Sequence, residues 1–154
     1  MRERENAGAV DAVGFEGDAS RRFGQALKLT AAVDYTYARV DGGDQAPQLT
    51  GRRPALTPRF TATGEAQWRP MSRLRLDLDL RYESARYDDD LNTLRLGPAV
   101  VADMRAEWTV SDRLSTYIAV DNLLDADIQT AESADRVYSY DAPRVIRIGL
   151  RLRR

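Results

Sequence analysis

A ten-residue segment in the middle of the chain alternates between apolar and charged residues without interruption. From Leu74 to Glu83, five apolar residues occupy the even positions and five charged residues the odd ones. At about 100° per residue, a helix would spread these apolar side chains round its whole circumference, whereas a strand places them on one face. The segment therefore predicts an amphipathic β-strand.

The same two-residue period recurs on both sides of this segment. It fits residues 27–37, 59–69, 100–110, 114–122 and 144–153, and a weaker strand covers about 10–22. Tight turns at 24–25, 70–72 and 111–113 alternate with long polar connections at 41–58, 88–98 and 125–143. This order is typical of an up-and-down antiparallel sheet, and in bacterial outer-membrane barrels the turns are periplasmic and the loops extracellular. We predict an all-β fold of about seven up-and-down antiparallel transmembrane β-barrel strands.

The aromatic residues of the apolar face indicate what that face contacts. Three tyrosines, Tyr35, Tyr37 and Tyr82, stand where strands run into long loops, and two tryptophans, Trp68 and Trp108, stand where strands run into turns. Small and aliphatic residues fill the face between them. Aromatic rims round an aliphatic band are typical of a lipid bilayer, because amphipathic rings settle at the depth of the headgroups. We predict that these five residues are membrane-interface aromatics. A small soluble barrel of the lipocalin type, with its apolar face inside and an apolar ligand, is the alternative.

The number of strands predicts that the chain is part of a larger barrel. Seven up-and-down strands leave the first and the last running parallel, which conflicts with the even strand number of single-chain bacterial barrels. An open sheet is not tolerated in lipid, because the backbone N–H and C=O groups of its two edge strands would lack hydrogen-bond partners. We expect further strands to complete the wall.

Composition argues against an enzyme and against a nucleic-acid partner. The 154 residues include no histidine and no cysteine, so the commonest general base and the usual zinc ligands and activated nucleophiles are missing. Serines such as Ser72, Ser111 and Ser115 have no base to activate them. No glycine-rich phosphate loop is present. The 23 basic and 24 acidic residues give no excess positive charge for nucleic acid. We predict no catalytic residues, cofactor or metal.

Three groups of charged residues are candidate binding or catalytic sites. The run Asp88-Asp89-Asp90 with Asn92 has oxygen ligands for a divalent cation, but it lacks the spacing of a calcium loop, and a solvated loop is favoured. Asp77 and Asp79 could act as paired carboxylates, although a cross-strand charge ladder with the flanking arginines is favoured. The pair Arg52-Arg53 could grip an anionic ligand, but a solvated loop tip is favoured.

An ordered set of short motifs resembles the C-terminal part of TonB-dependent outer-membrane receptors. The motifs that carry the resemblance are Asn6-x-Gly8, Gly14-Phe15-Glu16, Trp68-Arg69-Pro70-x-x-Arg73-Leu74, Arg81-Tyr82-x-x-x-Arg86-Tyr87-Asp88, Asp121-Asn122-Leu123-Leu124-Asp125, Pro143-Arg144 and Gly149-Leu150-Arg151. Within this set, Asn122, Leu123, Leu124 and Asp125 match the family's Asn-Leu-Phe-Asp signature after the penultimate strand.

The resemblance implies a location in the bacterial outer membrane and a role in uptake of a scarce nutrient such as a ferric siderophore or cobalamin. It implies that residues 1–154 form the last seven strands of a barrel of about 22. The implied partners are outer-membrane lipid, the remainder of the barrel, its plug, and the TonB system through N-terminal parts. The family's plug domain and energy-coupling box do not occur in this sequence, and Arg153-Arg154 stands in place of the usual terminal aromatic residue. We therefore expect the chain to be the product of a truncated reading frame or a fragment of such a receptor.

Overall fold

The computed structural model describes residues 8–153. Asn6, which opens the first family motif, and Arg154, which closes the sequence, lie outside the described residues.

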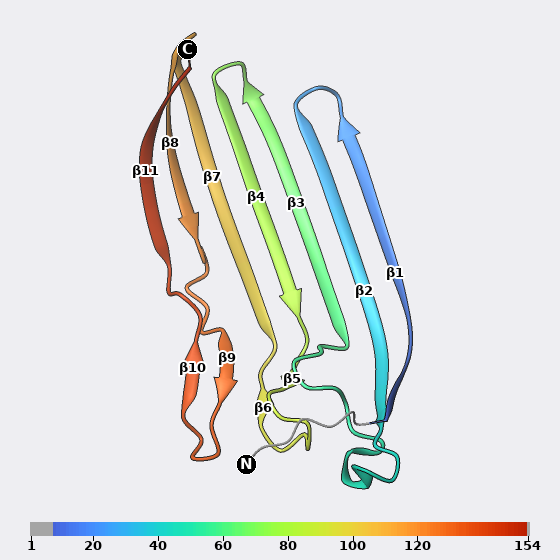
Figure 1. Ribbon diagram of the computed structural model, residues 1–154. Helices are drawn as coiled ribbons and strands as arrows, with labels where there is room; N and C mark the ends of the chain where they lie inside the picture. The colour runs from blue at the N-terminus through green and yellow to red at the C-terminus, as the bar shows by residue number, and fades with distance from the viewer. Residues whose placement is uncertain (1–7, 154) are drawn as a thin grey trace.

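Seven long strands form one antiparallel sheet, in which every strand lies beside its sequence neighbour among the seven. Their bounds are β1 Ala9–Phe23, β2 Leu27–Asp41, β3 Phe60–Met71, β4 Leu74–Glu83, β7 Ala99–Ser111, β8 Leu114–Asp121 and β11 Val145–Leu152. The turns lie at one end of the sheet and the long connections at the other (Figure 1). The prediction of seven up-and-down antiparallel strands is confirmed.

Two of the three tight turns are shorter than predicted because the strands run further, whereas the first, at residues 24–26, is one residue longer. Pro70 and Met71 belong to β3, so that the turn to β4 is only Ser72-Arg73. The pairing of β3 with β4 shifts register between Trp68 and Met71. Pro70 has no N–H to donate to a ladder, and a bulge is one of the places in a sheet where proline is tolerated.

The register of the sheet brings the apolar residues of neighbouring strands onto one face. Leu78 of β4 lies opposite Ala66 of β3 on one side and Met104 of β7 on the other. Ile118 of β8 lies opposite Ile148 of β11. Because side chains at directly opposite positions point to the same face, the period seen in each strand becomes a continuous apolar surface.

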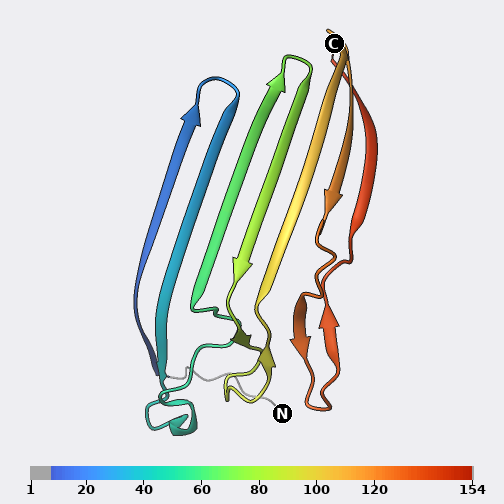
Figure 2. The same cartoon turned by 180° about the vertical axis from the view of Figure 1, so that it is seen from behind.

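The long connections contain regular structure that the sequence period did not predict. They hold a 3-10 helix η1 Pro47–Leu49 and four short strands, β5 Arg86–Tyr87, β6 Arg95–Leu96, β9 Gln129–Glu132 and β10 Tyr138–Tyr140. β5 pairs with β6 and β9 with β10. Both small hairpins lie beyond the loop end of the sheet (Figure 2).

The sheet has no central core, because both of its faces lie open. The buried apolar cluster sits at the loop end, where Ile128 of the last long connection packs against Ala99 and Val101 of β7. On the outward face of the edge strand β11, Ile148 is 77% exposed and Leu152 is 79% exposed. A continuous apolar surface of this kind marks a contact with lipid or with protein.

Candidate functional site

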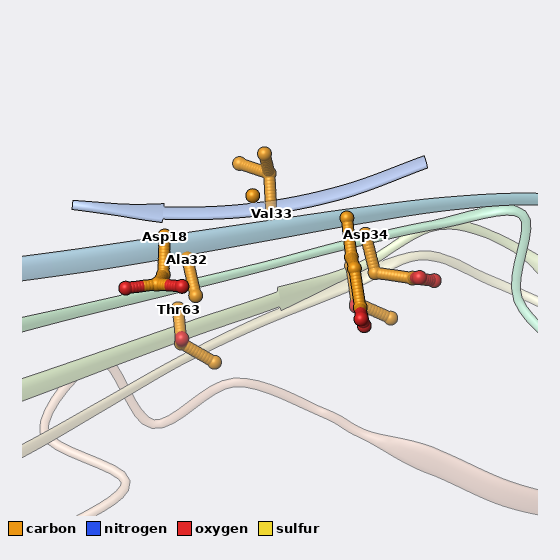
Figure 3. Close-up of a pocket in the computed structure, with 8 residues that line it drawn as sticks. Asp18, Ala32, Val33, Asp34 and Thr63 are labelled. Carbon is orange, nitrogen blue, oxygen red and sulfur yellow. The ribbon is translucent and has the colours of Figure 1, made fainter. Parts of the chain in front are cut away.

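The two faces of the sheet point in different directions relative to its curvature. Figure 3 shows Asp18, Ala32, Asp34 and Thr63 pointing toward the side on which the other strands curve round, and Val33 pointing away from it. Val33 belongs to the apolar face. The apolar face is therefore the outward one and the polar face is the inner wall.

An aromatic row crosses four strands at the loop end of the outward face. Phe15 lies opposite Tyr35, and Tyr35 lies opposite Phe60. The ring centroids of Phe15 and Tyr35 are 5.9 Å apart, and those of Phe60 and Tyr82 are also 5.9 Å apart. We call Phe15, Tyr35, Phe60 and Tyr82 the loop-end row; Tyr37 lies two residues further toward the loops. Phe15 and Phe60 were not among the predicted rim residues, although their position in the two-residue period would have placed them there.

Two tryptophans mark the turn end of the same face. Trp68 lies opposite Leu76 and Trp108 lies opposite Leu74, so they flank the start of β4. Both side chains are exposed. From Leu74 to Tyr82 the strand spans about 26 Å, or about 20 Å along the membrane normal at a tilt near 40°. The five predicted aromatics thus share one face at the two ends of an aliphatic band, and their role at the membrane interface remains a prediction.

The inner wall near the loop end is a shallow acidic hollow. Glu16 and Asp34 are directly opposite each other on β1 and β2, and Asp18, Thr61 and Thr63 line the same hollow (Figure 3). Within residues 8–153 no group of three or more acidic residues is arranged to hold a metal ion. The hollow is an acidic part of the inner wall.

At the turn end, the buried carboxylate of Glu107 connects the last three strands of the seven-stranded sheet, β7, β8 and β11. Glu107 of β7 accepts a hydrogen bond of 2.8 Å from the Ser115 hydroxyl of β8 and one of 3.1 Å from the Arg151 guanidinium of β11. Arg105 contributes a longer contact of 3.5 Å. The positive charges of Arg151 and Arg105 balance the negative charge of the Glu107 carboxylate. These contacts connect β7, β8 and β11.

The predicted cross-strand charge ladder is present at Arg75 and Asp77, which lie directly opposite Glu107 and Arg105 of β7, but it does not extend to Asp79. Arg75 pairs with Asp77 two residues along the same strand, at 2.9 Å. Asp79 lies between two other acids, Glu65 of β3 and Asp103 of β7. Like charges directly opposite each other destabilise a sheet pair unless water solvates them, so this row also fits a hydrated wall.

The motif Asn122-Leu123-Leu124-Asp125 follows directly after β8. It connects the first and the last residues of the long connection between β8 and β11. Asn122 is buried and adopts a positive φ of 50°, a conformation that asparagine tolerates better than most residues. Its side chain accepts a hydrogen bond from the Ala126 N–H at 2.9 Å and donates to the Ala126 carbonyl at 3.0 Å. Asp125 accepts hydrogen bonds from the backbone and guanidinium of Arg144. In contrast, Leu124 is 57% exposed. The motif is a structural turn.

Arg53 is part of a contact between two long connections, so the prediction of a solvated loop tip is wrong for this residue. Its N–H donates to the Asn92 side chain at 2.8 Å, and its guanidinium donates to the carbonyls of Thr57 and Ala85 at 3.1 and 3.3 Å. Arg52 is exposed, as a loop-tip residue would be.

The acidic run 88–90 is used in loop hydrogen bonds. The Asp88 carboxylate accepts from the Glu132 N–H at 2.8 Å, and that of Asp89 accepts from the backbone of Thr93 and Leu94 at 2.8 and 2.7 Å. Burial alone would raise the pKa of Asp89, but the hydrogen bonds from Leu94 and Thr93 outweigh it and lower that pKa. These carboxylates hold the loop in shape and leave little free for a cation.

A third contact joins the loops round Arg86 and Gln129. Arg86 forms an ion pair with Glu83 and donates to the Gln129 carbonyl at 3.2 Å. The Gln129 side chain accepts from the Gly97 N–H at 2.8 Å. The three long connections therefore form one layer over the loop end of the sheet. No helix among the described residues is long and apolar enough to span a membrane.

Comparison with known proteins identifies what the sheet is similar to. The family model described as TonB-dependent receptor-like, β-barrel, matches residues 3–123. The Ferrioxamine receptor of Yersinia enterocolitica is 32% identical over 110 residues, which are 68% of this chain and 15% of that receptor. The chain thus spans a small part of the curated relative that it matches.

Solved structures show the same fold. The ferric yersiniabactin uptake receptor of Yersinia pestis superimposes with a TM-score of 0.84 at 24% identity, over 96% of this chain and 24% of that receptor. A siderophore receptor of Acinetobacter baumannii gives a TM-score of 0.81 at 17% identity, over 93% of this chain and 22% of that one. The seven-stranded sheet therefore corresponds to part of a receptor barrel.

Proposed function

This chain belongs to the TonB-dependent receptor-like β-barrel family, and we propose that residues 1–154 form a C-terminal segment of the barrel in an outer-membrane receptor for a scarce nutrient. Receptors of this family are non-enzymatic transporters that reside in the bacterial outer membrane. The prediction that the chain is not an enzyme and belongs in that membrane is confirmed.

The observation that carries the proposal is the register of the sheet. Leu78, Met104 and Ile118 lie on one outward surface together with the aromatic residues at its two ends, while the charged residues line the inner wall. Contact with lipid favours apolar residues on the outward face, and a water-filled lumen favours charged residues on the inner face. The edge strands β1 and β11 are not paired with each other, so further strands of the receptor would complete the wall.

A small soluble barrel of the lipocalin type does not fit the chain. In such a barrel the edge strands pair and the apolar residues line the interior. Here the sheet is open, with β1 and β11 at its two edges, and Val33 points away from the concave side (Figure 3).

We propose a ferric siderophore as the transported nutrient in preference to cobalamin. The support is the relatives: one is a receptor for ferrioxamine and another takes up ferric yersiniabactin. In the proposed receptor the loop layer faces the medium, a plug fills the lumen, and energy comes from the TonB system through parts outside this chain.

Uptake in cells tests this proposal. We expect cells that lack the gene for the full-length protein to lose uptake of at least one radioiron-labelled siderophore under iron limitation, and to regain it when the gene is restored. Collapse of the proton gradient should stop that uptake. Cobalamin uptake in the same cells is the control. Recovery of the protein in the soluble fraction, or unchanged uptake of every siderophore tested alongside reduced cobalamin uptake, would contradict the proposed nutrient or location.

A further inference from the structure

Basic side chains gather at the turn end of the inner wall. One shallow hollow there is lined by five arginines, which are Arg69, Arg73, Arg75, Arg151 and Arg153. A second hollow beside it is lined by Arg69 together with Arg22 of β1 and Lys28 of β2. We call the basic residues of these two hollows the turn-end basic patch.

Only part of the positive charge of this patch is balanced within residues 8–153. The arginines of β4 and β11 form ion pairs at 2.9 and 3.1 Å, and Arg153 approaches a carboxylate only at 3.9 Å. In the same range no ion pair involves Arg22, Lys28, Arg69 or Arg73. The patch therefore keeps an excess of positive charge, which an external anion would neutralise.

The backbone places this excess charge at the rim of the sheet. The Arg69 N–H donates to the Ala26 carbonyl at 2.7 Å, and the Arg73 carbonyl accepts from the Thr109 N–H at 2.8 Å. Arg69 directly follows Trp68, which marks the turn end of the outward apolar band, and Arg73 belongs to the β3–β4 turn. The turns and the end of β11 lie at the same end of the sheet (Figure 1). Both arginines thus lie beyond the apolar band, where a partner outside the membrane can reach them.

The width and the chemistry of the patch favour an extended polyanion over a small anion or a folded protein. The patch reaches from β1 to β11 across seven neighbouring strands, or about 29 Å at about 4.8 Å per strand. One small anion would contact only a fraction of it. Protein interfaces contain an apolar core that is rich in aromatic residues, whereas the first hollow combines its arginines with Ser72, Thr109 and Glu107.

We propose that the turn-end basic patch binds carboxylate groups of the cell-wall peptidoglycan. This inference rests on the proposed function, because in an outer-membrane barrel the short turns face the periplasm. Peptidoglycan is an extended polymer of that compartment, and its peptide stems carry carboxylates at regular intervals. The planar guanidinium fork binds a carboxylate in a bidentate manner. The receptor wall would contact the cell wall through its periplasmic rim.

Co-sedimentation of the full-length receptor in detergent with purified peptidoglycan sacculi tests the site. The patch variant is Arg69→Gln with Arg73→Gln, which leaves the contacts of Glu107 intact. The control, Arg52→Gln with Arg95→Gln, removes the same charge from exposed residues at the loop end. We expect the patch variant to raise the apparent Kd at least about threefold, because each exposed charge pair contributes modestly. The control should leave the Kd unchanged.

Chemical modification of the polymer tests the carboxylate chemistry separately. Sacculi whose carboxylates have been converted to amides should bind the wild-type receptor no better than unmodified sacculi bind the patch variant. Added salt should weaken binding of the wild-type receptor to unmodified sacculi, because the contacts are exposed to solvent. Heat-modifiable migration in gel electrophoresis checks that each variant is folded.

Several results would overturn the site. These are an unchanged Kd in the patch variant, an equal loss in the loop-end control, or undiminished binding to amidated sacculi. Slower siderophore uptake by the patch variant with unchanged sacculus binding would assign the arginines to the path of the transported ligand instead. A wild-type receptor that takes up a siderophore but does not bind sacculi would overturn this inference alone. Absence of the wild-type receptor from the outer membrane would contradict the proposed function itself, and the peptidoglycan site with it.

Discussion

Leu78 lies at the middle of the outward apolar band, and an arginine there tests which face meets lipid. It stands four residues from Leu74, beside Trp108, and four from Tyr82 in the loop-end row. Four residues of strand advance about 13 Å, or about 10 Å along the membrane normal at a tilt near 40°. Arginine at the midplane of a barrel's lipid face costs about 2–4 kcal/mol. Leu78→Arg should therefore lower the folding equilibrium constant by about 30- to 700-fold, at about 1.4 kcal/mol per tenfold.

The matched control for Leu78→Arg is Gln67→Arg on the inner wall at nearly the same depth. Gln67 lies between Lys28 of β2 and Asp77 of β4, so an added positive charge there meets one cation and one anion. We expect it to change the free energy of unfolding by no more than about 0.5 kcal/mol. Trp108→Arg, near the interface, should carry a charge cost of only about 0–1 kcal/mol, besides the lost ring contacts.

Reversible urea unfolding of the full-length receptor in lipid vesicles, followed by tryptophan fluorescence, measures these differences in unfolding free energy. Arginine at the midplane of a lipid face destabilises a barrel by at least about 2 kcal/mol. A loss of less than about 1 kcal/mol of unfolding free energy in Leu78→Arg would therefore refute the outward assignment of the apolar face. An equal cost for Gln67→Arg would refute the hydrated inner wall.

Three further predictions concern the wall and the loop layer. A Cβ on Gly149 would lie 2.6 Å from the Tyr117 ring, so Gly149→Ala should destabilise the folded protein by about 1–3 kcal/mol, as overpacking does, and Tyr117→Ser in the same chain should restore most of the loss in urea unfolding. Asn122→Ala should cost about 1–3 kcal/mol, because buried hydrogen bonds are lost at a residue with positive φ; Asn122→Gly, which keeps the conformation, should cost less, and equal losses would show that φ is unimportant. Because its folded pKa is lowered, Asp89 stabilises the loop above its unfolded pKa of about 4 and loses this effect as the pH falls through the folded value; Asp89→Asn should therefore speed hydrogen exchange of the Leu94 amide at pH 7, and similar exchange in both proteins at that pH would contradict this role.

The strands and the outward face could be predicted from the sequence because they depend on a short-range pattern. The alternation from Leu74 to Glu83 identifies a strand and its two faces without any knowledge of neighbours, and the structure reproduces its bounds. The small hairpins were missed because strands of two to four residues are too short to display a period.

The contacts of the loop layer and the inner wall could not be predicted because they join residues far apart in the chain. Arg53 and Asn92 are 39 residues apart, and Glu107 and Arg151 are 44 apart. Register decides which of these side chains meet, and a single sequence shows alternation within each strand but not the register between strands. For the same reason the sequence does not show that the charge ladder stops at Asp79, which lies opposite Glu65 and Asp103.

Cysteine labelling in the full-length receptor tests the central claim most directly. Single cysteines at each position from Leu74 to Glu83 would be exposed in intact outer membranes to a lipid-soluble thiol probe and to a water-soluble one. We predict that the lipid-soluble probe labels the even positions and the water-soluble reagent labels the odd ones. Labelling of the opposite sets would show that the apolar face is an interior core and would contradict the assignment of this sheet to a transmembrane barrel wall.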